Sequence, residues 1–338
     1  MEEWLKQAIA DAAGEVPMPQ TIIPSVVPGR VLSLDGDYLA YFMAGNDDTD
    51  IGAARRNSVN RIVIMKEMTG SERCIMNLSA SGCTKADRFL IATVRPYQEL
   101  RAGSGKPKNW AGLRDFFESY QGDVFRPKIW GDREADDGMA FLQHTQISRD
   151  KTDLIVTATR DKDMRQYPGW HMNWMTYQTI YVDPASESAC YETIGPDGLI
   201  YGTKWFWLQC LQGDSADCIP GLPRYRSHTG KFVLCGDATA LKLLADCGCD
   251  AEAFDRVLEL YETFYGELAL ERLGEQMLLL WLRRDNNASY ADMLSHLRLT
   301  SLQRGLLSHC IQSHANRVRV MKEQVLEIEK RTATACPY

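Results

Sequence analysis

The sequence has no long apolar run and no repeated pair of closely spaced cysteines. A membrane-spanning helix needs roughly 18 apolar residues, and "MLLLWL" (Met277–Leu282) is among the longest runs present. The ten cysteines include "CGC" (Cys247 and Cys249), which lacks the second pair or histidine motif of a zinc site. We therefore interpret them as reduced thiols of an intracellular protein. The acidic, amphipathic start "MEEWLKQAIADAAGEV" argues against a signal or transit peptide.

The chain has no net positive charge: 45 acidic residues outnumber 38 basic ones, and the formal net charge is −7. The field of the whole molecule would repel nucleic acid, so any nucleic-acid binding must come from local basic patches. The six histidines show no ligand spacing, and we expect none to be catalytic. The 338 residues, 45% of them apolar, suffice for one large domain or two modest ones.

Strands alternate with helices in the first 200 residues, which predicts an α/β architecture. A short helix over residues 1–15 precedes a proline-rich linker, and "RVLSLDGD" then reads as a strand that ends at Asp35. Residues 51–68 suit a helix, 74–78 a second strand, and "DLIVTAT" a strand of the kind buried in parallel sheets. After about Gly202 the pattern becomes helical, and the aromatic helix "GTKWFWLQCLQ" contributes to the core.

Acidic residues directly follow four apolar elements: "VLSL", "PKIW", "LIVTAT" and the aromatic helix. They are Asp35; Glu134, Asp136 and Asp137, in a helix expected to start near Asp132; Asp161 and Asp163; and Asp214 and Asp217. In parallel sheets ligands gather at the carboxyl ends of the strands, so the first three groups could converge. Alternatively, each group only caps a helix or forms a turn. If all eight carboxylates converge they need divalent cations, and paired Mg²⁺ or Mn²⁺ ions suit phosphodiester hydrolysis.

The order "LDGD … READD … TRDKD … GDSADCIPG … GDATALKLL" resembles the flap endonuclease / 5′→3′ exonuclease family. The sequence looks most like the replication exonucleases of short-tailed phages and is similar to the 5′-nuclease domain of bacterial DNA polymerase I. The resemblance covers about residues 30–285. It implies a PIN-like α/β nuclease core with a mainly parallel sheet over 29–200, after an amino-terminal segment 1–28. A helical DNA-binding region over 201–285 and a helical extension over 286–338 would follow.

The resemblance also implies roles for single residues. The eight carboxylates correspond to the family's set of two-metal ligands. "GDSADCIPG" and "GDATALKLL" would form a helix–three-turn–helix element that binds duplex phosphates, often with a potassium ion. Its implied DNA-binding residues are Gly213, Ile219, Gly221, Gly236 and Thr239. Backbone N–H groups at such glycine turns bind phosphate without reading sequence.

The segment 85–114 holds seven basic and two acidic residues and would correspond to the family's arch, through which a single strand passes. The family's Y-K-x-x-R motif is retained at Tyr97 and Arg101. These two residues, with Lys85 or Arg88, would act on the scissile phosphate. Lys106 and Lys108 would contact DNA and make binding salt-sensitive. The alternative for such a basic run is a solvated face.

Three departures from the family pattern matter. First, "NLSASG" (Asn77–Gly82) has no acid where the family usually has one after the second strand, and Asp37 or Asp87 could replace it. Second, Gln98 stands in place of a basic residue. Third, "RYRSHTGKFVLC" lengthens a hairpin, with Arg224, Arg226, Lys231 and His228 as extra phosphate contacts or as a plain surface insertion.

These observations predict a metal-dependent 5′→3′ DNA exonuclease or 5′-flap endonuclease that acts in the cytoplasm of a phage-infected bacterium. Its expected partners are duplex DNA with a 5′ end or flap, or an RNA–DNA hybrid. Two alternatives stay open. One is a DNA-junction binding protein that has lost catalysis, and the other is a hydrolase that removes RNA primers with the same site.

Overall fold

A computed structural model describes residues 23–103, 105–227 and 229–335. The helix predicted over residues 1–15 and His228 lie outside these ranges. A six-stranded sheet with the order β3-β2-β1-β4-β5-β6 forms the first half of the structure, and only β6 is antiparallel to its neighbour. The strands are β1 (Val27–Asp35), β2 (Ser71–Ser79), β3 (Arg126–Trp130), β4 (Ile155–Thr159), β5 (Gly169–Asn173) and β6 (Thr179–Val182). The predicted mainly parallel sheet is confirmed.

Strand β1 lies at the centre of the sheet because its apolar residues find parallel partners on both sides. Leu34 is aligned with Met76 of β2 and with Ala158 of β4, and all three side chains are fully buried. The chain stays tightly packed against β2 just past the end of β1, since a Cβ on Gly36 would come within 2.6 Å of Met76. The carboxyl ends of β1, β2 and β4 therefore meet at one edge of the sheet.

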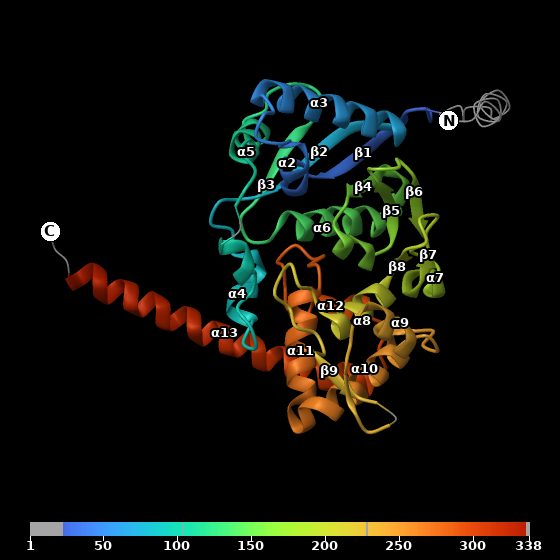
Figure 1. The fold of residues 1–338 in the computed structure, drawn as a ribbon, viewed down its shortest axis with the longest axis vertical. Coiled ribbons are helices and arrows are strands. Elements are labelled where there is room, and N and C mark those ends of the chain that lie inside the picture. The colour runs from blue at the N-terminus through green and yellow to red at the C-terminus, as the bar shows by residue number, and fades with distance from the viewer. Residues whose placement is uncertain (1–22, 104, 228, 336–338) are drawn as a thin grey trace, which may run out of the picture.

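Helices cover both faces of the sheet (Figure 1). Helices α2 (Gly36–Met43), α3 (Ile51–Met68) and α5 (Trp110–Glu118) lie on one face, and α6 (Ala135–Ile147) lies on the other. Helix α6 begins three residues later than the predicted Asp132. Glu134 is its N-cap, and the side chains of Glu134 and Asp137 form a capping box that sets the start.

The second half of the chain is mainly helical, as predicted (Figure 1). Its helices are α7 (Glu187–Tyr191), α8 (Thr203–Gln212), α9 (Asp237–Leu243), α10 (Asp250–Tyr265), α11 (Ala269–Leu280), α12 (Asp292–His296) and α13 (Ser301–Ala335). Two small antiparallel pairs, β7 (Thr193–Ile194) with β8 (Ile200–Tyr201) and β9 (Arg224–Arg226) with β10 (Phe232–Leu234), complete it. No described helix is both long and apolar enough to cross a membrane.

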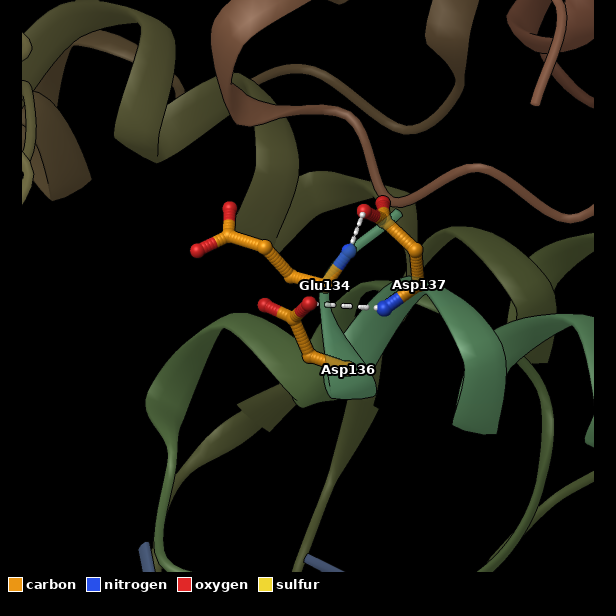
Figure 2. Close-up of side chains that lie close together, drawn as sticks. All are labelled: Glu134, Asp136 and Asp137. Carbon is orange, nitrogen blue, oxygen red and sulfur yellow. Dashed lines mark hydrogen bonds between the residues drawn. The ribbon is translucent and has the colours of Figure 1, made fainter. Parts of the chain in front are cut away.

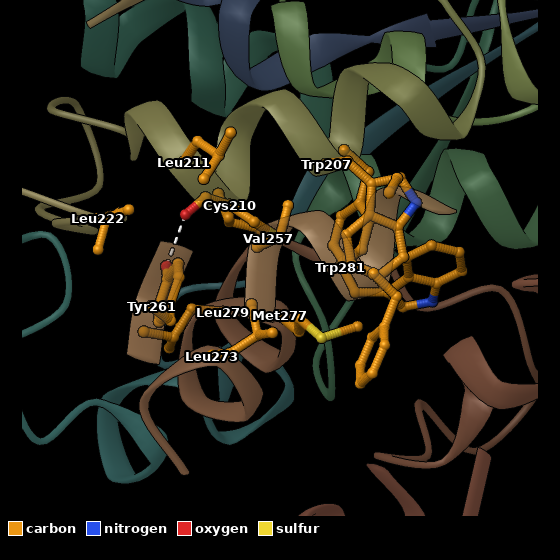
Figure 3. Packing of buried hydrophobic residues seen from close by; sticks show 14 of the residues in the cluster. Trp207, Cys210, Leu211, Leu222, Val257, Tyr261, Leu273, Met277, Leu279 and Trp281 are labelled. Atoms are coloured by element: carbon orange, nitrogen blue, oxygen red, sulfur yellow. Dashed lines mark hydrogen bonds between the residues drawn. The ribbon is translucent and has the colours of Figure 1, made fainter. Parts of the chain in front are cut away.

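One large apolar cluster holds this helical region together (Figure 3). Phe206 and Trp207 are fully buried in it, which confirms that the aromatic helix contributes to the core. The Tyr261 hydroxyl donates a hydrogen bond to the Cys210 carbonyl at 2.6 Å, so the polar end of that ring is also satisfied. Leu307 of α13 joins the same cluster, and the predicted ranges 201–285 and 286–338 thus share one core.

Two expectations from the sequence differ from the structure. Helix α11 ends at Leu280, although the segment "ELALERLGEQMLLLWLRR", read from the sequence as one helix, continues to Arg284. Trp281 is extended instead, and its indole N–H donates to the Asp292 carboxylate at 2.9 Å. This path brings the backbone N–H of Arg283 to Asp137 at 2.8 Å. Strands β5 to β8 have no predicted counterpart.

Candidate metal centre

The acidic residues after β1 and β4 lie at the shared edge of the sheet. Asp35 caps α2 by accepting a hydrogen bond from Tyr38 N at 2.9 Å, and its second oxygen accepts one from the Thr159 hydroxyl at 2.7 Å. Asp161 caps the short 3-10 helix η4 (Lys162–Gln166) by accepting from Asp163 N at 2.9 Å. The carboxylates that end β1 and β4 are thereby held beside one another.

Two groups of three carboxylates lie nearby. Glu134, Asp136 and Asp137 form one group at the start of α6 (Figure 2), and Asp163, Asp214 and Asp217 form the other. Within each group, one oxygen of every carboxylate lies within 4.8 Å of the others. Such sets of hard oxygen ligands are suited to Mg²⁺ or Mn²⁺.

Tyr97 and Gln98 connect the two groups. The Tyr97 hydroxyl lies 2.8 Å from Glu134 Oε2 and 3.1 Å from Asp217 Oδ2. The Gln98 amide donates to Glu134 Oε1 at 3.1 Å and to Asp217 Oδ1 at 2.9 Å. Burial and the neighbouring carboxylates raise the pKa of Tyr97, so its hydroxyl keeps its proton. The structure therefore brings all eight predicted carboxylates into one region.

Three of these carboxylates make no ion pair within the described part of the chain: Asp35, Asp136 and Asp161. Burial is the main cause that raises the pKa of each of them. The charges of Asp137 and Glu134 raise the pKa of Asp136 further, and those of Asp163 and Asp35 raise that of Asp161. Buried carboxylates that repel one another in this way are stabilised in the ionised form by a divalent cation.

Asp137 differs, because a buried arginine forms an ion pair with it through both of its oxygens. Arg88 donates to Oδ1 and Oδ2 at 2.7 Å each, and the backbone N–H groups of Arg283 and Glu134 supply the other bonds. The Arg88 charge lowers the pKa of Asp137 against the effect of burial. Asp137 is thus placed to anchor the start of α6, and Arg88 to hold Asp137 and, at 3.3 Å, Glu134.

Three further cations pair with the remaining carboxylates. Lys85 lies 3.1 Å from Glu134, Arg101 pairs with Asp217, and Lys162 pairs with both Asp163 and Asp214. Eight carboxylates and the four cations, Arg88 included, leave four negative charges when all are ionised. The charge of two divalent cations would balance this excess.

The expected substitutes for the missing acid near Ala80 are engaged elsewhere. Asp37 forms an ion pair with Arg114 and accepts hydrogen bonds from Ser79 N. Asp87 pairs with Lys322 and accepts a hydrogen bond from the Tyr290 hydroxyl. Neither belongs to a group of three metal-binding side chains in residues 23–103, 105–227 and 229–335.

The helix–three-turn–helix candidate begins with two glycines in close contact. Gly213 has a φ of 73° and Gly221 a φ of 59°, and a Cβ on Gly221 would lie 2.3 Å from Gly213 N. Ile219 is 4% exposed, and its backbone N–H and carbonyl are both hydrogen-bonded to Asp214 at 2.8 Å, so neither its side chain nor its backbone is placed to contact DNA. Gly236 is exposed as the N-cap of α9, and Thr239 is half-buried in the first turns of that helix.

The basic segment and the hairpin present further cations. Lys106 Nζ lies 3.5 Å from the centre of the Trp110 ring, and Lys108 donates to the Asp47 carbonyl at 2.7 Å. Arg224 and Arg226 are exposed on β9, which pairs with β10 as the predicted hairpin. All four basic side chains therefore lie on the surface of the protein.

Sequence reasoning missed two of the cations that matter most at the acidic region. Lys162 stands between Asp161 and Asp163, so its position in "RDKD" could have identified it. Arg114 reaches Asp37 and the Ser79 carbonyl from α5, and no local pattern indicates that contact. The buried position of Arg88, at 1% exposed, was also not foreseen.

Comparisons with known proteins find only distant likenesses. No family model and no curated protein matches the chain. A structure of the bacteriophage T5 5′-exonuclease with bound zinc aligns with 86% of this chain and 99% of its own, at 14% identity and a TM-score of 0.49. A bacteriophage T5 flap endonuclease, in a pseudo-enzyme–product complex with DNA and metal ions, aligns with 86% and 99%, at 13% identity and a TM-score of 0.48. At these identities and TM-scores the likeness does not assign a function.

Proposed function

We propose that the protein is a metal-dependent nuclease that hydrolyses phosphodiester bonds of DNA from 5′ ends or at 5′ flaps. The observation that carries the proposal is the set of buried carboxylates without ion pairs, Asp35, Asp136 and Asp161, beside two further acidic groups. The excess of four negative charges matches two divalent ions. The 5′ polarity rests on the motif order in the sequence.

Divalent ions in such a site activate water and stabilise the attacking and leaving oxygens of an in-line displacement. Asp136 and Asp161 would hold the ions, and Asp35, fixed by Tyr38 N and Thr159, would orient toward them. Because Asp35 and Asp161 lie in neither three-carboxylate group, the ions would keep part of their water shell.

The cations at the edge of the site would guide the substrate. Arg101 is 53% exposed along its side chain and Lys85 is 22% exposed, so both can shift from a carboxylate to a phosphate oxygen. Arg88 is buried and donates to Asp137, Glu134 and three carbonyl oxygens. We therefore assign Arg88 a positioning role instead of the direct phosphate contact that the sequence predicted.

Duplex DNA would bind at the turn between Gly213 and Gly221 and at the N-terminus of α9 near Gly236, without reading sequence. The N–H groups of Gly213 and Gly221 donate to the Gln209 carbonyl and to the Gln276 side chain, so these two glycines would shape the turn. The proposal includes a potassium ion at this element, Lys106 and Lys108 as phosphate contacts, and action in the cytoplasm of a bacterial host. A potassium-dependent change in duplex affinity, with sodium as the control, tests the ion.

A second candidate is a DNA-junction binding protein without catalysis. The observation that favours it is that Asp37 pairs with Arg114 and Asp87 with Lys322. Neither carboxylate therefore takes the place of the acid that the family usually has near Ala80. A hydrolase specific for RNA primers would use the same acidic residues and differ only in its substrate.

One assay distinguishes these candidates. Duplexes with a blunt 5′ end, a 5′ flap or an RNA-primed end, each labelled at the 5′ terminus, are incubated with Mg²⁺, Mn²⁺ or EDTA. Our proposal predicts metal-dependent release of short labelled products from DNA ends. Binding without products in both metals supports the junction-binding protein, and products only from the RNA-primed end support the primer hydrolase.

A further inference from the structure

A second feature borders the acidic site: a cavity of about 260 Å³ at the carboxyl ends of β4 and β5. Asp161 forms part of its wall, so the cavity adjoins the proposed metal centre. Its other charged residues are Arg160, Lys162 and Arg165, and its apolar wall includes Met164, Met172 and Tyr201. Lys162 is paired with Asp163 and Asp214, so Arg160 and Arg165 against Asp161 make this cavity basic, whereas the adjoining site is acidic.

The two arginines of the cavity have no ion pair with a carboxylate in residues 23–103, 105–227 and 229–335. The Arg165 guanidinium lies 3.6 Å from the centre of the Trp205 ring, and its Nε donates to the Lys162 carbonyl at 3.2 Å. The Arg160 guanidinium lies 5.6 Å from the centre of the Phe42 ring. Aromatic faces therefore hold both guanidinium planes while leaving hydrogen-bond donors for an anion. A planar guanidinium binds phosphate through paired hydrogen bonds.

The apolar wall and the size of the cavity limit what the anion can be. Met164 and Met172 are 1% and 2% exposed, and Tyr201 is 5% exposed. Leu199, which is 42% exposed, and Met175 also line the cavity, so an apolar surface lies beside the guanidinium groups. The volume is smaller than the roughly 300–1,000 Å³ of pockets for drug-sized ligands, so the cavity has room for at most one nucleotide.

We propose that this cavity binds one nucleotide through its 5′-phosphate, with the base against Met175 and Leu199, which are 50% and 42% exposed. The inference rests on the proposed nuclease function and narrows it. The terminal nucleotide of the degraded strand places its 5′-phosphate between Arg160 and Arg165, and the next phosphodiester then reaches Asp161. The protein would accordingly prefer 5′-phosphorylated ends and release mononucleotides.

The first test measures binding in EDTA, so that no cleavage contributes. Thymidine 5′-monophosphate and thymidine are titrated separately into the full chain, with binding followed by calorimetry. We expect the monophosphate to bind at least about tenfold more tightly than thymidine, and Arg160→Ala and Arg165→Ala each to weaken it about tenfold. Arg126→Ala, on β3 at the opposite edge of the sheet, is the matched control and should leave the affinity unchanged. Circular dichroism confirms that each variant is folded.

Equal affinity for the two compounds, no binding of the monophosphate at millimolar concentration, or unchanged affinity in both cavity variants would overturn the inference. These outcomes do not depend on catalysis, so they are separate from a failure of the nuclease proposal, which would show as no cleavage of any DNA.

The second test distinguishes a strand end from a free nucleotide. Duplexes with a 5′-phosphate or a 5′-hydroxyl are digested with Mg²⁺, and the products are separated by length. We expect faster cleavage of the phosphorylated end, mononucleotide products, and loss of that preference when Arg160 and Arg165 are both alanine. Equal rates on both ends, with monophosphate binding intact, would show that the cavity takes only free nucleotides and would overturn its assignment to the strand end.

Discussion

Arg88 and Asp137 form a two-bond ion pair in the interior of the protein. Nη1 lies 2.7 Å from Oδ2 and Nη2 lies 2.7 Å from Oδ1, and the two residues are 1% and 0% exposed. Arg88 comes from the short helix α4 (Arg88–Ile91), and its Nε and Nη2 also donate to the carbonyls of Leu279 and Trp281. One side chain thus joins the basic segment, the acidic helix and the end of α11.

We predict that Arg88→Met is strongly destabilising. It leaves Asp137 as a buried carboxylate without its cation, so the free energy of unfolding in urea should fall by about 3–5 kcal/mol. Adding Asp137→Asn to this variant removes the stranded charge and should restore part of the loss. If Arg88→Met changed stability by less than about 1 kcal/mol, the pair would not hold these elements together.

Asp136→Asn should separate stability from activity. Because Asp136 is buried among other carboxylates, loss of its charge should raise the melting temperature of the metal-free protein by about 2 °C. Cleavage with Mg²⁺ should fall more than about 100-fold, since an ion ligand is lost. Duplex binding, measured by fluorescence anisotropy in EDTA, should stay within about twofold. Cleavage at the native rate would exclude Asp136 as an ion ligand.

Stabilisation by Mg²⁺ should increase with pH. Burial raises the pKa of Asp163 from 3.8 to about 6, so between these values the folded state holds more protons than the unfolded state. The stability that Asp163 contributes to the metal-free protein is therefore lost as pH rises through that window. Mg²⁺ binds the ionised form, so the increase in melting temperature on adding Mg²⁺ should grow from pH 4.5 to about 7 and then level off.

The difference between samples with and without Mg²⁺ isolates this effect. Burial lowers the pKa of His144 and His171 to about 4, which destabilises the protein as pH falls below 6.5. The two histidines change the stability of both samples equally, so their effect cancels in the difference. A Mg²⁺-dependent increase that stayed constant over this range would contradict the carboxylate site.

Lys162→Met should strengthen metal binding while weakening the metal-free fold. The Lys162 ammonium pairs with Asp163 and Asp214 and so competes with a cation for the same oxygens. Its loss should lower the dissociation constant for Mn²⁺ several-fold, as measured by electron paramagnetic resonance, and lower the metal-free melting temperature. Lys151→Met, in an exposed turn, is the control. Weaker Mn²⁺ binding in Lys162→Met would show that the ammonium helps to build the metal site.

Much of this site could be predicted from the sequence because its acids follow apolar strands or, for Asp214 and Asp217, an apolar helix. Asp35 and Asp161 end apolar runs, and parallel strands bring such ends together. The start of α6 was misplaced because Asp132 is as good a cap in isolation as Glu134, and tertiary contacts at Asp137 decide between them.

The cations were harder to place, because their partners lie far away in the chain. Arg88 contacts the carbonyl of Leu279, 191 residues later, and Lys322 reaches Asp87 from α13. A basic residue in a polar segment gives no signal of such burial. Strands β5 to β8 have no clear signal in the sequence because they are short, with β7 and β8 only 2 residues each, so no periodic pattern can develop.

The most direct test of the metal centre is a crystal of the full chain soaked in manganese and measured at the manganese absorption edge. Anomalous peaks among Asp35, Asp136 and Asp161, with these side chains turned toward the ions, are the result that we predict. Well-ordered carboxylates with no anomalous peak near any of them, at a manganese concentration that supports cleavage in solution, would contradict the account.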